Sequence, residues 1–201
     1  EQRKTLESVV EITGRLLESG ADRGAFVLGV GGGITTDIAG FAASIYKRGV
    51  KFGFVPTTLL AQVDASIGGK NGVNFESYKN IVGTITQPQW VYICSEVLRT
   101  LHPKEFRAGV AEVLKTFILF DKEQYAAAVE YFSELEQYLA STGSYLKNGE
   151  FYKEERLLEI IGKCAEYKSA VVERDEFERG ERRMLNLGHT FAHAIEKICG
   201  D

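Results

Sequence analysis

Two histidines, His189 and His193, lie four residues apart in a run that also contains Asn186. Residues i and i+4 of an α-helix share one face, so both imidazoles would point the same way. Imidazoles placed like this can bind a divalent metal, bind a phosphate or exchange a proton with a reacting hydroxyl. A helix N-terminus with one buried and one solvated histidine has the same spacing, and spacing alone leaves both interpretations open.

A glycine-rich segment at residues 29–37 lies between an apolar run and an amphipathic stretch. Its glycines offer backbone N–H groups that no side chain obstructs, which predicts a pyrophosphate site at a helix N-terminus. The spacing is not the usual dinucleotide fingerprint, because a G-x-G-x-x-G register that begins at Gly29 ends on Ile34. A tight strand-to-helix turn is the simpler alternative.

Further polar residues gather after the next apolar run. Within residues 62–74, the seven residues from Asp64 to Lys70 include an acid, two glycines and a lysine, a density that packing alone rarely requires. Lys79 and Asn80 add a cation and an amide between two predicted strands. For this pair, a binding site and a solvated surface explain the sequence equally well.

The C-terminal half carries a second set of charged residues. Glu112 and Lys115 are three residues apart, either as a surface ion pair or, given their apolar neighbours, as a pair that points into a site. Lys168 and Arg182 add donors near the histidines. The acids within residues 173–178 are interpreted as a solvated, charged connection.

The elements that must position these residues change in character along the chain. Apolar periodicity and glycine or proline boundaries predict a helix, a strand, a helix and two further strands, at residues 6–17, 25–30, 34–46, 50–55 and 90–94. Strands that alternate with helices predict a parallel sheet with ligands at the carboxyl ends of its strands. Long helical patterns follow, at residues 105–120, 122–139 and 154–172. We therefore expect an α/β domain at 1–103 and a helical domain at 104–201.

Composition limits the class of protein. The 201 residues are 44% hydrophobic, enough for a substantial core, and the net charge of -4 provides no field to gather nucleic acid or an anionic membrane. Cys94, Cys164 and Cys199 lack CxxC spacing, which argues against a disulfide framework and a cysteine zinc site. With no signal-like apolar start and no run long enough to span a membrane, we expect a cytoplasmic protein without nucleic-acid or membrane partners.

The order of several motifs resembles the 3-dehydroquinate synthase family from Glu1 to the last residue. These motifs are Gly31-Gly32-Gly33 with Asp37, Pro56 to Asp64, Gly68-Gly69-Lys70, Lys79-Asn80, Ala111 to Lys115, and Asn186 to Thr190. The resemblance implies an α/β fold, with a Rossmann-like parallel sheet segment followed by an all-helical metal-binding domain. It also implies a homodimer.

The resemblance further implies a reaction of the shikimate pathway, in which 3-deoxy-D-arabino-heptulosonate 7-phosphate becomes 3-dehydroquinate and phosphate. In this family NAD first oxidises a ring hydroxyl, and phosphate is then eliminated. The hydride is returned to the substrate, and the opened ring closes by an aldol step. A divalent metal, zinc first and cobalt second, polarises the hydroxyl.

Site residues follow from the matching motif positions. The cofactor site would comprise Glu1, Lys4, Gly31, Gly32, Gly33, Asp37, Thr57, Thr58, Asp64, Lys70, Lys79 and Thr100. The metal ligands would be Glu112 and His189. The substrate would meet Asp64, Lys70, Asn80, Lys115, Lys168, Arg182, Asn186 and His193, while Arg48 would reach the phosphate site of a neighbouring subunit.

One departure from the family pattern is expected to matter. The family's third metal ligand is a histidine beyond the run near His189, and His102 matches no ligand position. A catalytic zinc normally has three protein ligands, and this chain supplies only Glu112 and His189. We therefore expect the chain to be an internal fragment that is inactive alone. A related cyclase such as 2-deoxy-scyllo-inosose synthase, a polyol dehydrogenase that releases NADH, and a noncatalytic domain of the same fold remain alternatives.

Overall fold

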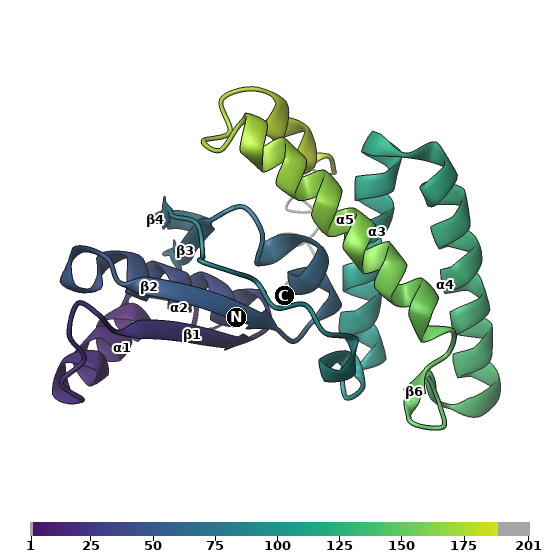
Figure 1. The fold of residues 1–201 in the computed structure, drawn as a ribbon, viewed down its shortest axis with the longest axis horizontal. Helices are drawn as coiled ribbons and strands as arrows, with labels where there is room; N and C mark the ends of the chain where they lie inside the picture. The colour runs from purple at the N-terminus through teal and green to yellow at the C-terminus, as the bar shows by residue number, and fades with distance from the viewer. Residues whose placement is uncertain (1, 189–201) are drawn as a thin grey trace.

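The computed structural model describes residues 2–188. Its N-terminal part is built on strands β1 (Phe26–Gly31) and β2 (Lys51–Pro56), which pair in parallel and are joined through helix α2 (Gly33–Ile45). Helix α1 (Leu6–Glu18) packs on α2, where Val9 is buried against Ile38 and Phe41 (Figure 1). The predicted βαβ arrangement is confirmed. The carboxyl ends of both strands therefore lie at one edge, with Gly31 opposite Pro56.

The predicted strand at 90–94 is reduced to a single parallel bridge. Val91 pairs with Phe54, and the amide of Tyr92 donates to the Phe54 carbonyl at 2.8 Å. Pro88 lies just before this segment, and the 3-10 helix η3 (Ser95–Leu98) follows it closely. Strand geometry is consequently confined to the middle of the segment.

An antiparallel hairpin was not predicted. Strands β3 (Lys70–Phe75) and β4 (Tyr78–Ile85) pair through most of their length, with a register shift between Val73 and Phe75. The hairpin lies directly on α2, since a Cβ atom on Gly40 would come within 2.0 Å of the Asn71 side chain. The predicted polar residues Lys70 and Asn80 thus lie on a hairpin that packs against α2.

The C-terminal part consists mainly of three long helices, α3 (Pro103–Phe120), α4 (Lys122–Thr142) and α5 (Glu154–Arg174), which confirm the three predicted helical segments. The Nδ1 atom of His102 accepts a hydrogen bond from the Lys104 amide at 3.2 Å, so His102 caps α3. Asp121 caps α4 in the same manner. A short hairpin of β5 (Leu146–Lys147) and β6 (Glu150–Phe151) departs from the all-helical expectation, at a turn where Asn148 and Gly149 have positive φ.

The largest core cluster joins the two parts of the chain. It contains aromatic and aliphatic side chains of α3, α4 and α5 together with Leu59 and Val63, which follow β2. Contacts of α5 and α3 with the segment after β2 therefore fix the helices against the strand ends. No helix within residues 2–188 combines the length and apolar character that crossing a membrane requires.

Gly109 of α3 provides a test of this packing. A Cβ atom at Gly109 would lie 2.6 Å from the Leu59 Cβ and 2.6 Å from the Leu60 backbone nitrogen. Because backbone cannot yield as a flexible side chain does, we expect Gly109→Ala to lower the free energy of unfolding by about 1–3 kcal/mol in urea denaturation. Gly14→Ala is the matched control: nothing lies within 4 Å of its added Cβ, and a gain of about 0.4–1 kcal/mol is expected. Equal midpoints for the two variants would contradict the proposed packing.

Candidate functional site

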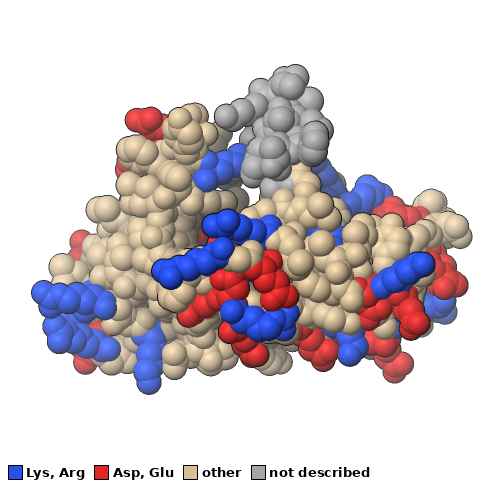
Figure 2. Space-filling model, turned by 90° about the horizontal axis from the view of Figure 1, so that it is seen from above, with Lys and Arg blue, Asp and Glu red and all other residues tan. Residues whose placement is uncertain are grey.

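A cavity of about 520 Å³ lies between the β3–β4 hairpin, the segment after β2 and the C-terminal end of α5. Seen from above, basic and acidic side chains stand beside one another across the middle of the molecule (Figure 2). The charged and amide side chains that line the cavity are Asp37, Asp64, Lys70, Asn71, Asn80, Lys168, Glu178, Arg182 and Asn186. The structure thus brings together residues that the sequence scatters over about three quarters of the chain.

Asp64 lies at the centre of the charge network. It belongs to a π-helical turn, Ala61–Ala65, in which the Ser66 hydroxyl donates to the Ala61 carbonyl at 2.6 Å. Such single π turns are frequent at functional sites because they redirect side chains. The Asp64 carboxylate contacts the ammonium of Lys168 and lies 3.5 Å from that of Lys115.

Gln62 anchors the same turn from the buried side. Its side chain is fully buried, and Nε2 donates to the carbonyls of Pro56 at 3.1 Å and Cys94 at 2.7 Å. It thereby ties the end of β2 to the end of the neighbouring segment. Neither Gln62 nor Asn71 was singled out from the sequence, because the neighbouring acid and lysine carried the more obvious chemistry.

Burial and charge oppose each other at Asp64. Burial alone would raise its pKa, but the ammonium groups of Lys168 and Lys115 outweigh burial and hold the pKa of this carboxyl well below its usual range. Burial lowers the pKa of Lys168, and the Asp64 carboxylate opposes that shift. We therefore assign a carboxylate to Asp64 at neutral pH, with buried cations beside it.

This arrangement predicts a pH dependence. Because the folded pKa of Asp64 lies below its unfolded value near 3.8, the folded state holds this proton less tightly. The contribution of Asp64 to stability is fully present above the unfolded pKa and is lost as pH falls toward the folded pKa. In unfolding titrations between pH 7 and pH 3, we expect the stability difference between the parent chain and Asp64→Asn to shrink with acidification. A difference that stays constant with pH would contradict this assignment.

Glu112 is the described residue best suited to hold a metal. Its Oε2 atom is buried and makes no hydrogen bond of acceptable geometry, although the Lys115 ammonium lies beside it. Burial and then the charge of Asp64 raise the pKa of Glu112, with Lys115 opposing. A buried acceptor without a hydrogen bond fits a metal ligand. No group of three His, Cys, Asp or Glu side chains that could hold a metal occurs within residues 2–188.

The glycine turn fits the pyrophosphate of a dinucleotide. No side chain caps the N-terminus of α2, and a Cβ atom on Gly32 would come within 2.9 Å of the Thr58 side chain. The Thr57 amide donates to the Gly31 carbonyl at 2.8 Å, which holds the turn against the end of β2. The turn therefore presents the N–H groups of a helix N-terminus where only glycine fits.

Lys4 and Asp37 lie at the hairpin side of the cavity. The Lys4 Nζ atom is 2.5 Å from Asp37 Oδ2 and also donates to Asn80 Oδ1. Burial raises the pKa of Asp37, and the Lys4 ammonium opposes the shift. Two residues predicted for the cofactor site thus meet one predicted for the substrate site, from the start of the chain, α2 and β4.

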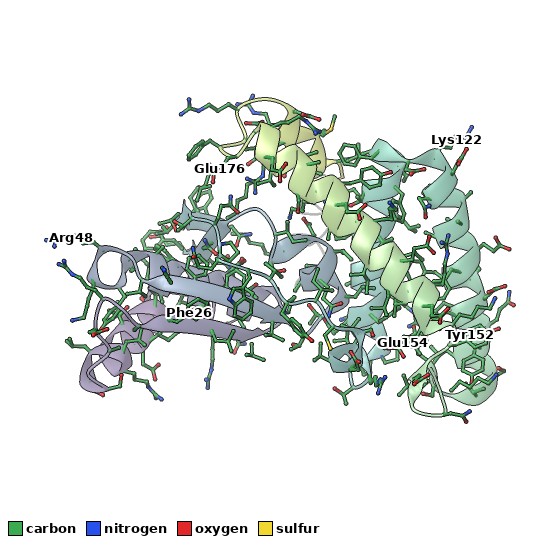
Figure 3. The ribbon with its side chains drawn as sticks, viewed as in Figure 1. Phe26, Arg48, Lys122, Tyr152, Glu154 and Glu176 are labelled. Carbon is green, nitrogen blue, oxygen red and sulfur yellow. The ribbon has the colours of Figure 1, made fainter. Side chains whose placement is uncertain are left out.

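Other predicted residues lie elsewhere. Arg48, in a left-handed conformation with φ 69°, is exposed at the end of the α/β part that is remote from α3, α4 and α5 (Figure 3). Thr100 is exposed in the link before α3, and Lys79 lies on β4 beside Asn80 without lining the cavity. Glu1, His189 and His193 lie outside the described residues.

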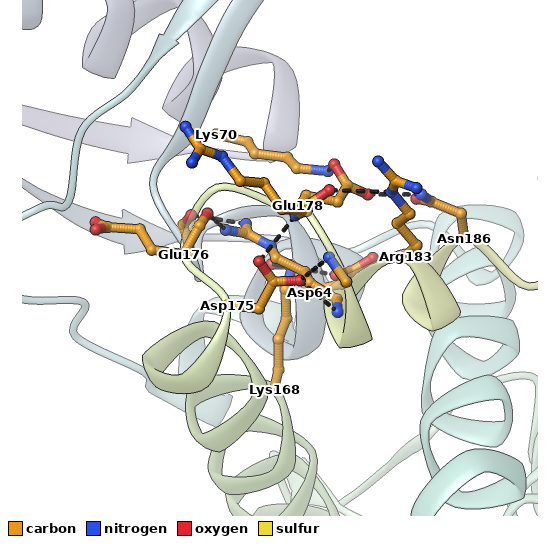
Figure 4. A network of polar contacts seen from close by, with 12 residues as sticks. Asp64, Lys70, Lys168, Asp175, Glu176, Glu178, Arg183 and Asn186 are labelled. Atoms are coloured by element: carbon orange, nitrogen blue, oxygen red, sulfur yellow. Dashed lines mark hydrogen bonds and ion pairs between the residues drawn. The ribbon is translucent and has the colours of Figure 1, made fainter.

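The interpretation of residues 173–178 as a solvated connection is wrong for three of its acids, of which Glu176 accepts a hydrogen bond from Gln87 Nε2 at 2.9 Å. Glu178 forms an ion pair with Lys70 and accepts a hydrogen bond from Asn186 Nδ2 at 2.6 Å (Figure 4). Asp175 accepts backbone hydrogen bonds from the loop that follows it. The acid density suggested solvent exposure, and sequence spacing does not reveal a partner as distant as Lys70.

Comparisons with known proteins identify the family. The model described as 3-dehydroquinate synthase N-terminal matches residues 1–108, and the model described as 3-dehydroquinate synthase C-terminal matches residues 109–201. The chain belongs to the 3-dehydroquinate synthase family. The resemblance inferred from the motifs is confirmed, and so is the fold class.

Individual relatives agree with this membership of the 3-dehydroquinate synthase family. A 3-dehydroquinate synthase from Campylobacter curvus is 44% identical over 200 residues, which cover 100% of this chain and 53% of the relative. The chain thus spans about half the length of the curated relatives it matches.

Two solved structures share the fold of this 3-dehydroquinate synthase family member. A 2-deoxy-scyllo-inosose synthase complexed with carbaglucose-6-phosphate, NAD+ and Co2+ has a TM-score of 0.81 at 30% identity, covering 98% of this chain and 51% of that one. A 2-epi-5-epi-valiolone synthase from Streptomyces hygroscopicus with NAD+ and Zn2+ bound has a TM-score of 0.79 at 32% identity, with the same coverage.

Proposed function

We propose that this chain carries the catalytic cavity of a 3-dehydroquinate synthase, which converts 3-deoxy-D-arabino-heptulosonate 7-phosphate into 3-dehydroquinate and phosphate. The observation that supports the proposal most directly is a cluster of charges at the cavity, in which Asp64 and Lys168 line the wall and Lys115 joins Asp64 to Glu112. Residues of α3, α5 and the segment after β2 must cooperate to make this cluster. Such a convergence of buried charges is typical of an active site.

NAD would be held by the glycine turn, Thr57 and Thr58 of the following loop, and Asp37 with Lys4. When bound, NAD would supply reversible hydride transfer, in which the hydride leaves the carbon that bears a ring hydroxyl and is later returned to the substrate. The turn would bind the pyrophosphate through its N–H groups, while Lys4 and Asp37 would orient the rest of the cofactor. Lys70, Lys79 and Thr100 complete the proposed cofactor site.

A divalent metal would be held by Glu112 together with His189. When bound, zinc or cobalt supplies Lewis-acid chemistry that lowers the pKa of a coordinated hydroxyl. Lys115 would place its side chain beside Glu112, and the Asp64 carboxylate would oppose the lowering of the Lys168 pKa by burial. The Lys168 Nζ atom would donate a hydrogen bond to a substrate oxygen.

The anionic groups of the substrate would lie at the other wall of the cavity. Lys70, Arg182 and Asn186 present cationic and amide donors there, which suit phosphate and carboxylate oxygens. Asn80 and His193 would add donors from β4 and from the histidine run. Arg48 would act on a neighbouring subunit in a homodimer, since it does not line the described cavity.

The main alternative to this proposal is a different cyclase activity, because the 2-deoxy-scyllo-inosose synthase structure with carbaglucose-6-phosphate has the same fold. Phosphate release should therefore be compared between 3-deoxy-D-arabino-heptulosonate 7-phosphate and glucose 6-phosphate, in a protein that carries this chain at the length of its relatives. Release from the first alone is expected. Release from glucose 6-phosphate alone would favour the competing cyclase, and release from neither would favour a noncatalytic domain.

We propose the cytoplasm as the location. Cys94 and Cys164 are free, as suits a reducing compartment.

A further inference from the structure

The loop after α5 is organised by a single carboxylate. Asp175 Oδ1 accepts a hydrogen bond from the Arg179 amide at 2.8 Å, and Oδ2 accepts from the amides of Gly180 at 2.7 Å and Arg182 at 3.0 Å (Figure 4). The amide of Asp175 itself donates to the Val171 carbonyl at 3.0 Å, so the same residue ends α5. Asp175 consequently fixes where the loop begins and where it turns back.

Arg182 is the residue that this loop delivers to the cavity. Its side chain is only 2% exposed, and the guanidinium donates to the Gly68 carbonyl at 2.7 Å and to the Glu176 carbonyl at 2.5 Å. Gly68 comes so close that a Cβ atom there would lie 2.5 Å from a guanidinium nitrogen. The place of Arg182 in the cavity wall therefore depends on the loop that carries it and on its contact with Gly68.

We propose that Asp175 is a positioning residue, which holds the backbone of residues 175–182 so that the Arg182 guanidinium lies in the cavity. Asp175 does not itself line the cavity and acts through Arg182. Hydrogen bonds from the loop amides lower the pKa of Asp175, so the residue accepts these bonds as a carboxylate at neutral pH. The expected effect of Asp175 on sugar phosphate binding rests on the proposed function, whereas the placement of Arg182 does not.

The placement can be measured by the reaction of arginines with phenylglyoxal, followed residue by residue with mass spectrometry. In Asp175→Ala, we expect Arg182 to react at least about tenfold faster than in the parent chain, the factor that loss of one charge-assisted hydrogen bond implies. Asp175→Asn retains the size of the side chain and should give a smaller increase. Glu181→Gln is the matched control, because Glu181 pairs with exposed Arg174 and accepts none of the loop amide bonds, and no change is expected.

General loosening is distinguished from positioning by the ratio of Arg182 reactivity to that of Arg99, a partly buried arginine in the link before α3. A ratio that rises supports the proposal, and a ratio that stays constant in both Asp175 variants overturns it. If Asp175→Ala fails to fold, the Asn variant provides the same ratio.

A kinetic comparison in a protein of the relatives' full length then tests the consequence. Asp175→Asn should raise KM for the sugar phosphate more than it lowers kcat. A parent protein without turnover would count against the proposed function, while the reactivity ratio would still decide the role of Asp175.

Discussion

Asp64→Asn is expected to lower the free energy of unfolding at pH 7 by about 3–5 kcal/mol, because it leaves the ammonium of Lys168 buried without its countercharge. Lys168 is 8% exposed, and its Nζ atom contacts both the carboxylate of Asp64 and, at 2.5 Å, the Asp64 carbonyl. Lys115 would lose the same partner. Urea denaturation of the chain provides the measurement.

A double-mutant cycle identifies the cause of that loss. Lys168→Met removes the buried charge, so the double variant Asp64→Asn/Lys168→Met should be more stable than the sum of the single changes predicts. Lys163→Met is the control on the same helix, since Lys163 and Glu166 form an exposed pair 3.0 Å apart, whose removal should cost less than about 1 kcal/mol. If the changes in the free energy of unfolding are strictly additive, Asp64 and Lys168 contribute to stability independently, which would contradict this cause.

Glu112→Gln is expected to weaken divalent-metal binding at least about 100-fold, the upper range seen when only an outer partner of a metal ligand is lost. The amide removes the negative charge that would hold the cation. This prediction rests on the proposed function and is measured as zinc affinity and phosphate release, in a protein at the length of its relatives. Stability should not fall, because burial and the nearby Asp64 already raise the pKa of Glu112 and make its charge unfavourable in the folded protein.

Glu105→Gln is the appropriate control for this change. Glu105 lies in the first turn of α3 and is exposed, whereas the Oε2 atom of Glu112 is buried. Metal affinity should remain unchanged in this variant. Equal metal affinity in Glu112→Gln and the parent protein would remove Glu112 from the proposed ligand set.

Local sequence signals predicted the helices and the glycine turn well, for reasons visible in the structure. The apolar period of α3, α4 and α5 corresponds to faces buried in one core, and Asp121 supplies the cap that its position before α4 suggests. The β3–β4 hairpin was missed because its two glycines, Gly72 and Gly83, lie opposite one another at a close backbone approach rather than at a turn. Glycine frequency alone does not distinguish these two uses.

The assembly of the cavity depends on contacts that spacing cannot reveal. Lys168 meets Asp64 across 104 positions, and Arg182 meets Gly68 across 114. Family resemblance placed Asp64, Lys168 and Arg182 in one site, whereas sequence spacing alone did not connect them. The role of Asp175 was hidden for the same reason, since its partners are backbone amides and no side-chain pattern marks them.

The most direct test of the proposed function follows phosphate and NADH together, in a protein that carries this chain at the full length of its relatives. The protein is supplied with NAD, zinc and 3-deoxy-D-arabino-heptulosonate 7-phosphate. We expect phosphate to be released over many turnovers while NADH does not accumulate, because the hydride returns to the substrate within each cycle. NADH that accumulates with turnover in the absence of phosphate release would contradict the cyclase assignment and would indicate a dehydrogenase instead.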